Sequence, residues 1–203
     1  MSPKRCLAAA DPSLWAQFKD ALGDKKALSK EDIEAGDTYY NYQRRDPATE
    51  GEAPGASVFY KNDAGEIDLT VDGADEIGPG LSLIKGGGAA LLREKLVWEA
   101  SRRCVVIADA AKHVKRLGAF PLPVEVVAFG HRTTARRLFD ALAECDLGAA
   151  PSLRLRDGVP VRTDNGGVIY DIPCGVIPDP SLLADALRSV TGVVEHGLFL
   201  DLA

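Results

Sequence analysis

A glycine turn between a short apolar run and a helical pattern is the feature that most constrains this chain. The apolar run ends at Ile84, Lys85 and three glycines follow, and a helical pattern then continues to about Arg103. A strand, a glycine turn and a helix in this order aim backbone N–H groups and the positive end of the helix at an anion. A glycine run can also be only a tight turn, because glycine is the usual residue at positive φ. The neighbouring sequence has to distinguish these two interpretations.

The residues on both sides of the turn predict part of a doubly wound α/β unit. Apolar and polar side chains alternate over residues 67–72, which is typical of a strand. The continuous apolar run 104–108 is typical of a strand that is buried on both faces. A helix between two such strands is part of a doubly wound α/β unit. Too few residues separate the first strand from residues 81–84 for a helical crossover, so we expect a short extended piece there.

Charged side chains follow three successive segments of this unit. Asp72 and Asp75 follow the first strand, Lys85 follows the second apolar run, and Lys112 follows the third. Open α/β sheets bind their ligands outside the carboxyl ends of the strands. We therefore expect these four side chains at the same edge of the sheet.

The second part of the chain predicts a ferredoxin-like α+β domain. Its order of elements is β-α-β-β-α-β, the split-βαβ pattern. The expected elements are a strand over 124–129, a helix opened by Thr133 or Thr134, a strand around Leu153 and Leu155, a strand over 168–172, a helix from Pro180 and a strand over 193–200.

We place the domain boundary near Phe120. Residues 1–120 then form the first, α/β domain, in which the sequence of residues 1–65 diverges from this pattern, and residues 197–203 are expected to return to it. Residues 121–196 are the ferredoxin-like domain. The fold class expected from the sequence is therefore α/β, with a second α+β domain.

Composition restricts the classes of function. The chain has 203 residues, 46% of them hydrophobic and 27% charged, which is typical of a globular protein with its own core. A net charge of −6 argues against nucleic-acid binding. The four cysteines are scattered, so we expect reduced thiols, no metal site and a cytoplasmic location. The sequence contains no apolar stretch long enough to span a membrane.

Several motifs together resemble the ribose-5-phosphate isomerase, type A, family. They occur in collinear order between about Glu66 and Phe199. They are DGADEI (72–77), LIKGGGAALLREK (83–95), the IAD stretch that leads to Lys112, FPLPVEV (120–126) and TDNGG (163–167). The resemblance implies a Rossmann-like domain that carries the active site and a ferredoxin-like domain that assists oligomer contacts. It also implies a homodimer that needs no cofactor or metal.

The reaction that the resemblance implies interconverts D-ribose 5-phosphate and D-ribulose 5-phosphate in the pentose phosphate pathway. A base removes a proton next to a carbonyl, a cis-enediolate forms, and the proton returns to the neighbouring carbon. This aldose–ketose isomerisation requires a carboxylate base, donors for the enediolate oxygens and groups that bind the phosphate.

The resemblance assigns the general base to Glu94. Apolar neighbours at helical spacing predict partial burial, which would raise the pKa of its carboxyl toward neutrality, where a base works best. The alternative interpretation is a solvent-exposed helix carboxylate beside Lys95.

The resemblance assigns Asp72 and Asp75 to positions that orient sugar hydroxyls and assist ring opening. Gly73 and Ala74 lie between them and are expected to contact the substrate as well. The alternative is turn chemistry, because Asp side chains commonly accept hydrogen bonds from backbone N–H groups in turns.

The remaining expected groups are donors. The resemblance assigns Lys85 to the enediolate oxygen, and the N–H groups of Gly86, Gly87 and Gly88 would add an oxyanion-hole arrangement. Lys112 matches a substrate-binding lysine that would meet the phosphate. The alternative for Lys85 is a surface lysine at a strand end, and the alternative for Lys112 is a solvated helix lysine.

Two other functions compete with an active isomerase. The family's GTGS-type N-terminal loop, which binds the substrate phosphate, has no match in residues 1–65, so a catalytically impaired sugar-phosphate-binding protein of the same fold is one alternative. An effector-sensing domain of a transcription regulator is another, but the acidic first 65 residues speak against a basic helix-turn-helix. The combination of the two aspartates with Lys85 and Glu94 favours the isomerase.

Overall fold

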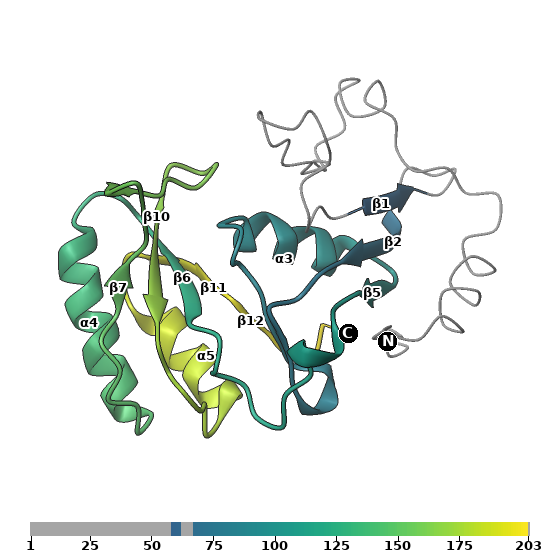
Figure 1. The fold of residues 1–203 in the computed structure, drawn as a ribbon. Coiled ribbons are helices and arrows are strands. Elements are labelled where there is room, and N and C mark those ends of the chain that lie inside the picture. The colour runs from purple at the N-terminus through teal and green to yellow at the C-terminus, as the bar shows by residue number, and fades with distance from the viewer. Residues whose placement is uncertain (1–57, 62–66, 203) are drawn as a thin grey trace. The chain divides into compact units, whose positions relative to one another are not determined.

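The computed structural model describes residues 58–61 and 67–202, so most of the divergent residues 1–65 lie outside the described part of the chain. The described residues divide into two compact units, each of which is described by itself (Figure 1). The first unit contains residues 58–61, 67–74, 93–110 and 202, and the second contains residues 75–92 and 111–201. The domain boundary expected near Phe120 stays a prediction.

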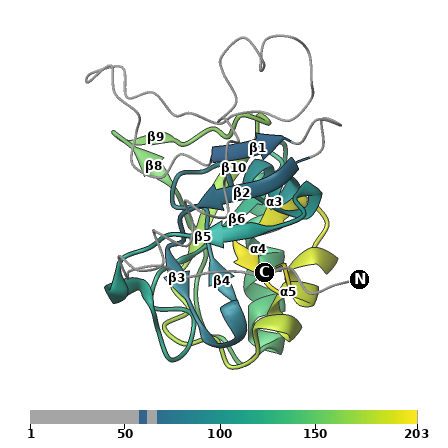
Figure 2. The ribbon, with the colours of Figure 1, turned by 90° about the vertical axis from the view of Figure 1, so that its right-hand side faces the viewer.

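The first unit contains a three-stranded sheet in which β1, β2 and β5 lie side by side (Figure 2). Strand β2 (Ile67–Asp72) pairs antiparallel with β1 (Val58–Lys61) and parallel with β5 (Cys104–Val106). Helix α3 (Leu91–Ala100) precedes β5 along the chain. Two parallel strands with a helix in their connection are the α/β arrangement that the sequence predicts.

Helix α3 packs against this sheet through apolar and polar contacts. Val97 packs against Ile67 of β2. At the end of the helix the hydroxyl of Ser101 donates to the carbonyl of Val97 at 2.6 Å and lies 2.6 Å from the hydroxyl of Thr70. Because both hydroxyls are buried, this pairing avoids the cost of an unsatisfied polar group.

A second three-stranded sheet lies in the second unit and is antiparallel. Strand β4 (Leu83–Ile84) lies between β3 (Glu76–Ile77) and β12 (Leu198–Phe199), and the 3₁₀ turn η1 (Pro79–Leu81) joins β3 to β4. The short extended piece expected at 81–84 is therefore confirmed. The connection from β2 is too short for a parallel crossover, and β4 pairs antiparallel with β3 and β12 instead.

The ferredoxin-like arrangement of the second unit is confirmed. The elements are β6 (Leu122–Val126), α4 (His131–Glu144), β7 (Ser152–Leu153), β10 (Val168–Ile172), α5 (Pro180–Ser189) and β11 (Val193–His196). The sheet order is β11-β6-β10-β7 with every pair antiparallel, as the split-βαβ topology requires. A small hairpin of β8 (Leu155–Arg156) and β9 (Val159–Pro160) connects β7 to β10.

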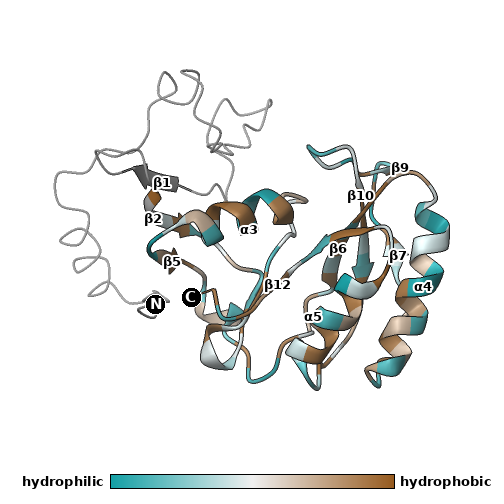
Figure 3. Ribbon diagram, turned by 180° about the vertical axis from the view of Figure 1, so that it is seen from behind, coloured by the Kyte–Doolittle hydropathy of each residue, from teal (hydrophilic) through white to brown (hydrophobic). Residues whose placement is uncertain are grey.

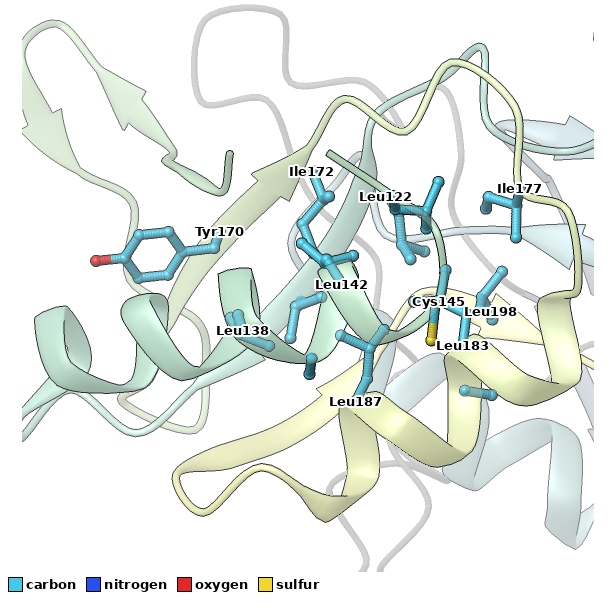
Figure 4. Packing of buried hydrophobic residues seen from close by; sticks show 14 of the residues in the cluster. Leu122, Leu138, Leu142, Cys145, Tyr170, Ile172, Ile177, Leu183, Leu187 and Leu198 are labelled. Atoms are coloured by element: carbon cyan, nitrogen blue, oxygen red, sulfur yellow. The ribbon is translucent and has the colours of Figure 1, made fainter. Parts of the chain in front are cut away.

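Helices α4 and α5 cover one face of this sheet. Both helices combine apolar and polar residues (Figure 3), and their apolar side chains meet those of β6 and β10 in one core cluster (Figure 4). Its members with no exposed surface include Leu122, Val124, Val126, Leu138, Leu142, Ile172, Leu183 and Leu187. Burying each such side chain contributes about 1.5–3 kcal/mol relative to leaving it exposed, so this layer is the main source of stability in the unit.

Several boundaries differ from those expected. The strand expected around Leu153 and Leu155 is divided between β7 and β8, and helix α3 ends at Ala100 and not near Arg103. Helix α4 begins at His131 and not at Thr133 or Thr134, because Gly130 adopts a left-handed conformation that turns the chain into the helix earlier. Strand β6 ends at Val126, before the expected residue 129. Strand β5 ends at Val106, earlier than the apolar run 104–108 suggests.

The last expected strand is divided at Gly197. The N–H of Gly197 donates to the carbonyl of Pro123 at 2.8 Å, and its own carbonyl accepts the N–H of Lys85 at 2.9 Å. The chain thus leaves the sheet beside β6 and joins β4 at this residue. A Cβ here would lie 2.2 Å from the carbonyl oxygen of Lys85, so the position requires glycine.

Replacing Asp179 with Ala should destabilise the second unit. Asp179 is the N-cap of α5, and its Oδ1 accepts the N–H groups of Ser181 and Leu182 at 3.0 Å. We expect Asp179→Ala to lower the free energy of unfolding by about 1 kcal/mol in urea denaturation. The control is Asp185→Ala on the same helix, whose carboxylate is exposed and pairs with Arg188; this variant should stay within about 0.5 kcal/mol of the unmodified protein. Equal losses in the two variants would contradict the capping role.

Candidate functional site

Asp72 lies at the carboxyl edge of the parallel strand pair in the first unit. It is in register with Val106 of β5, and its carbonyl accepts the N–H of Ile107 at 2.9 Å. Its side chain is 3% exposed, and Oδ1 accepts the N–H of Gly73 at 2.7 Å. The local turn bond predicted as the alternative is therefore present, and the carboxylate is still placed where α/β sheets bind ligands.

Glu94 lies in the first turn of α3 and is half-buried. Buried apolar side chains of the same helix, Leu91, Val97 and Trp98, are its neighbours in sequence. The positive end of a helix dipole stabilises negative charge at this position. The alternative interpretation, a solvent-exposed carboxylate, is therefore wrong, because Glu94 is half-buried.

Asp75 and the glycine turn are joined directly within the second unit. Oδ2 of Asp75 accepts the N–H of Gly87 at 2.8 Å, and the backbone N–H of Asp75 donates to the carbonyl of Ile84 at 2.8 Å. A Cβ on Gly87 would lie 2.8 Å from Oδ1 of Asp75. A side chain at residue 87 would therefore require the Asp75 carboxylate to move, and one of the turn's expected donors already serves Asp75.

Gly86 supplies the bend of the turn. Its φ is +105°, and a Cβ would lie 2.9 Å from Cβ of Leu91. The carbonyl of Gly86 accepts the N–H of Ala89 at 2.9 Å, which closes the turn before α3 begins. The glycines thus form a tight turn, and anion binding by this turn stays a prediction.

Lys85 is buried and is not a surface lysine. Its side chain is only 2% exposed, and its Nζ lies 5.6 Å from the centroid of the Phe199 ring, within reach of a cation–π interaction. The pairing of β4 with β12 places Phe199 opposite Leu83, the first residue of β4. A charged ammonium is costly to bury, so its position here points to a defined role.

Lys112 ends the short 3₁₀ turn η2 (Ala110–Lys112) and is half-buried. The next residue, His113, forms a parallel bridge with Ile77 of β3, and the N–H of Val114 donates to the carbonyl of Ile77 at 2.8 Å. Lys112 therefore follows the third segment, as expected, and the backbone after it is fixed to β3.

The expected site residues fall into two groups. Asp72, Gly73, Ala74 and Glu94 belong to the first unit, and Asp75, Lys85, Gly86, Gly87, Gly88 and Lys112 belong to the second. Within the second unit the structure brings Asp75 directly onto the glycine turn. In the part of the chain that the structure describes, no cluster of three or more His, Cys, Asp or Glu residues could hold a metal ion. No helix in that part is long and apolar enough to span a membrane.

Glu76 is a structural residue that sequence reasoning did not assign. It is buried, and its two carboxylate oxygens accept the N–H groups of Phe120 at 2.5 Å and Gly118 at 2.7 Å. It thereby anchors the loop that follows Lys112. Burial and, to a smaller extent, the negative charge of the nearby Glu76 raise the pKa of the Cys174 thiol to about 12. Glu76 lies within the DGADEI motif, but its partners are more than forty residues away, so no local pattern shows this role.

Arg154 is a second residue that sequence reasoning missed. Its Nη1 donates to the carbonyls of Gly86 at 2.9 Å and Gly87 at 3.0 Å. Its Nε donates to Asp171 at 2.8 Å, and Nη2 contacts the other carboxylate oxygen of Asp171. The sequence shows Arg154 only as a polar residue in an alternating strand, and its partners come from two distant segments.

Replacing Gly86 with Ala should destabilise the protein more than replacing Gly166. Both glycines have positive φ, which costs an Ala residue roughly 1–2 kcal/mol. A Cβ at Gly166 would meet nothing within 4 Å, whereas a Cβ at Gly86 would clash with Leu91. We therefore expect Gly86→Ala to lower the free energy of unfolding by about 1–3 kcal/mol more than Gly166→Ala in urea denaturation. Equal losses would show that the turn relaxes around the added methyl group.

Known proteins match this chain in sequence and in structure. A protein named ribose-5-phosphate isomerase A from Caulobacter sp. (strain K31) is 70% identical over 149 residues, which cover 73% of this chain and 66% of that protein. A solved ribose 5-phosphate isomerase from Plasmodium falciparum aligns with a TM-score of 0.65 at 34% identity, covering 70% of this chain and 61% of that one. A solved D-ribose-5-phosphate isomerase in complex with phospho-erythronic acid aligns with a TM-score of 0.60 at 36% identity, covering 68% and 59%.

The matches cover only part of the length of each relative. The chain spans about two thirds of the length of the curated relatives it matches, 66% for Caulobacter sp. and 62% for a protein of the same name from Caulobacter vibrioides. A family model described as Ribose 5-phosphate isomerase A (phosphoriboisomerase A) matches residues 46–203, a range that begins before the motifs and extends past them. The resemblance found in the motifs is thus confirmed: the chain belongs to the ribose 5-phosphate isomerase A family.

Proposed function

We propose that this protein is an aldose–ketose isomerase that interconverts D-ribose 5-phosphate and D-ribulose 5-phosphate in the pentose phosphate pathway. The observation that carries the proposal is the family match over residues 46–203, a range that contains every candidate site residue. The reaction proceeds through a cis-enediolate and requires no metal or redox cofactor.

Glu94 is the proposed base that moves the proton between the two carbons. Its half-buried position at the start of α3 supports this role, because a partly buried carboxylate has fewer bound water molecules to lose before it accepts the substrate proton. A positioned base of this kind contributes about 10²–10⁴-fold to the rate.

Lys85 is the proposed donor to the enediolate oxygen, and Asp72 and Asp75 are proposed to orient the sugar hydroxyls and assist ring opening. The burial of Lys85 supports its role, because a positive charge interacts with a developing oxyanion more strongly away from bulk water. Gly73 and Ala74, the turn 86–88 and Lys112 are proposed to contact the substrate, with Lys112 at the phosphate.

The assembly and location belong to the same proposal. We propose a cytoplasmic homodimer whose ferredoxin-like part contributes to the oligomer contacts, with a small sugar phosphate as its ligand and neither nucleic acid nor membrane as a partner. The net charge of −6 supports the exclusion of nucleic acid. Light scattering coupled to size exclusion tests the dimer, because a homodimer has twice the mass of the 21.6 kDa chain.

The purified protein should convert ribose 5-phosphate to ribulose 5-phosphate in the presence of EDTA. The physical reason is that a lysine and backbone N–H groups can stabilise the enediolate without a metal. The measurement is the rate of ketose formation with and without the chelator. No turnover, together with retained binding of phospho-erythronic acid, which one solved relative binds, would support the catalytically impaired binding protein in its place.

Glu94→Gln should lower kcat by about 10²–10⁴-fold with little change in KM, because the amide cannot accept the substrate proton. The matched control is Glu99→Gln on the same helix, where the side chain is exposed. It should retain the activity of the unmodified protein. Equal kcat values for Glu94→Gln and Glu99→Gln would exclude Glu94 as the base.

A further inference from the structure

The guanidinium group of Arg154 joins an acidic side chain to the glycine turn. On one side it forms a two-point contact with Asp171, and on the other its Nη1 donates to the carbonyls of Gly86 and Gly87. Both side chains of the ion pair are mostly shielded from solvent, with 15% exposure for Arg154 and 23% for Asp171. A two-point contact between arginine and a carboxylate fixes the plane of the guanidinium, so its remaining donors have a defined direction.

The glycine turn transmits this contact to Asp75. The carbonyl of Gly86 and the N–H of Gly87 belong to the same planar peptide unit and point in opposite directions. Arg154 therefore binds one side of that peptide, while Oδ2 of Asp75 accepts the N–H on its other side at 2.8 Å. A cation on the carbonyl polarises the peptide and strengthens the hydrogen bond that its N–H donates.

Three consecutive glycines have little conformational preference of their own, since glycine occupies positive and negative φ about equally. Apart from the bond between the Ala89 N–H and the Gly86 carbonyl, the turn thus depends on contacts from outside for a single geometry. Arg154 binds two successive carbonyls of the turn, at Gly86 and Gly87, from the link between β7 and β8, more than sixty residues away.

We propose that Arg154 is a positioning residue for the isomerisation, held in place by Asp171. It fixes the turn 86–88 and, through the N–H of Gly87, the carboxylate of Asp75, without touching the substrate. The inference rests on the proposed function, in which Asp75 and the turn contact the sugar. A displacement of about 1 Å in such groups can lower a rate by about 10²-fold, so the loss is expected in kcat more than in KM.

The kinetic test compares four variants of the full chain with the unmodified protein, using ribose 5-phosphate. Arg154→Ala should lower kcat by about 10–100-fold, and Arg154→Lys should recover only part of that loss because a lysine cannot form the same planar contacts. Arg154→Ala combined with Asp171→Asn should be no slower than Arg154→Ala alone, since Asp171 acts through Arg154. The control Arg156→Ala changes an exposed arginine of the neighbouring strand β8 and should retain full activity.

NMR spectroscopy tests the conformation of the turn independently of activity. When only the glycines are labelled with ¹³C′ and ¹⁵N, a carbonyl-to-amide correlation spectrum shows only glycine N–H groups whose preceding residue is also a glycine. In this sequence these are the N–H groups of Gly87, Gly88 and Gly167. In Arg154→Ala the peaks of Gly87 and Gly88 should shift or broaden. The peak of Gly167, whose N–H donates to Thr163, should stay in place as an internal control.

The outcomes separate this inference from the proposed function. Displaced Gly87 and Gly88 peaks, with reduced kcat and with activity partly restored to Arg154→Ala by added guanidinium ion, support it. Unchanged peaks, or a kcat equal to that of Arg156→Ala, overturn it while the isomerase proposal stands. An unmodified protein with no isomerase activity overturns the proposed function and the catalytic role of Arg154, and the spectra then show whether Arg154 still holds the turn.

Discussion

The close approach of two backbone segments at Lys85 and Gly197 is the constraint on which the second unit depends. The N–H of Lys85 donates to the carbonyl of Gly197, and no side chain at residue 197 could fit beside the carbonyl of Lys85. This contact lets the last strand leave β6 and pair with β4, which places Phe199 within reach of the Lys85 ammonium. The position of Lys85 is therefore determined from the other end of the chain.

The candidate site is maintained by polar contacts of its carboxylates and of a guanidinium with backbone groups. Asp72 accepts the N–H of Gly73, Asp75 accepts that of Gly87, and Glu76 accepts those of two residues in the loop after Lys112. Arg154 acts in the opposite sense, by donating to two carbonyls of the turn. Charged groups that bind backbone restrict loops and glycine turns that have few apolar contacts of their own.

Much of the fold could be predicted from the sequence, because its elements have clear periodic patterns. The strand 168–172 and the helix from Pro180 were predicted at their observed starts, since turn residues and a proline mark them. Boundaries set by backbone conformation were less predictable. Gly130 begins α4 earlier than the threonines suggest, and Gly197 divides a continuous apolar pattern into two strands.

The sequence by itself determined the two types of unit, the glycine turn before a helix, and the motifs that indicate the family. These depend on residues close together in the chain, where side-chain period and turn chemistry act locally. Only the tertiary structure decided that Lys85 is buried, that Asp75 accepts the N–H of Gly87, and that Arg154 binds the turn. The physical reason is that burial and hydrogen bonds between distant segments depend on how strands pair, and two-residue strands such as β3 and β4 leave almost no periodic signal.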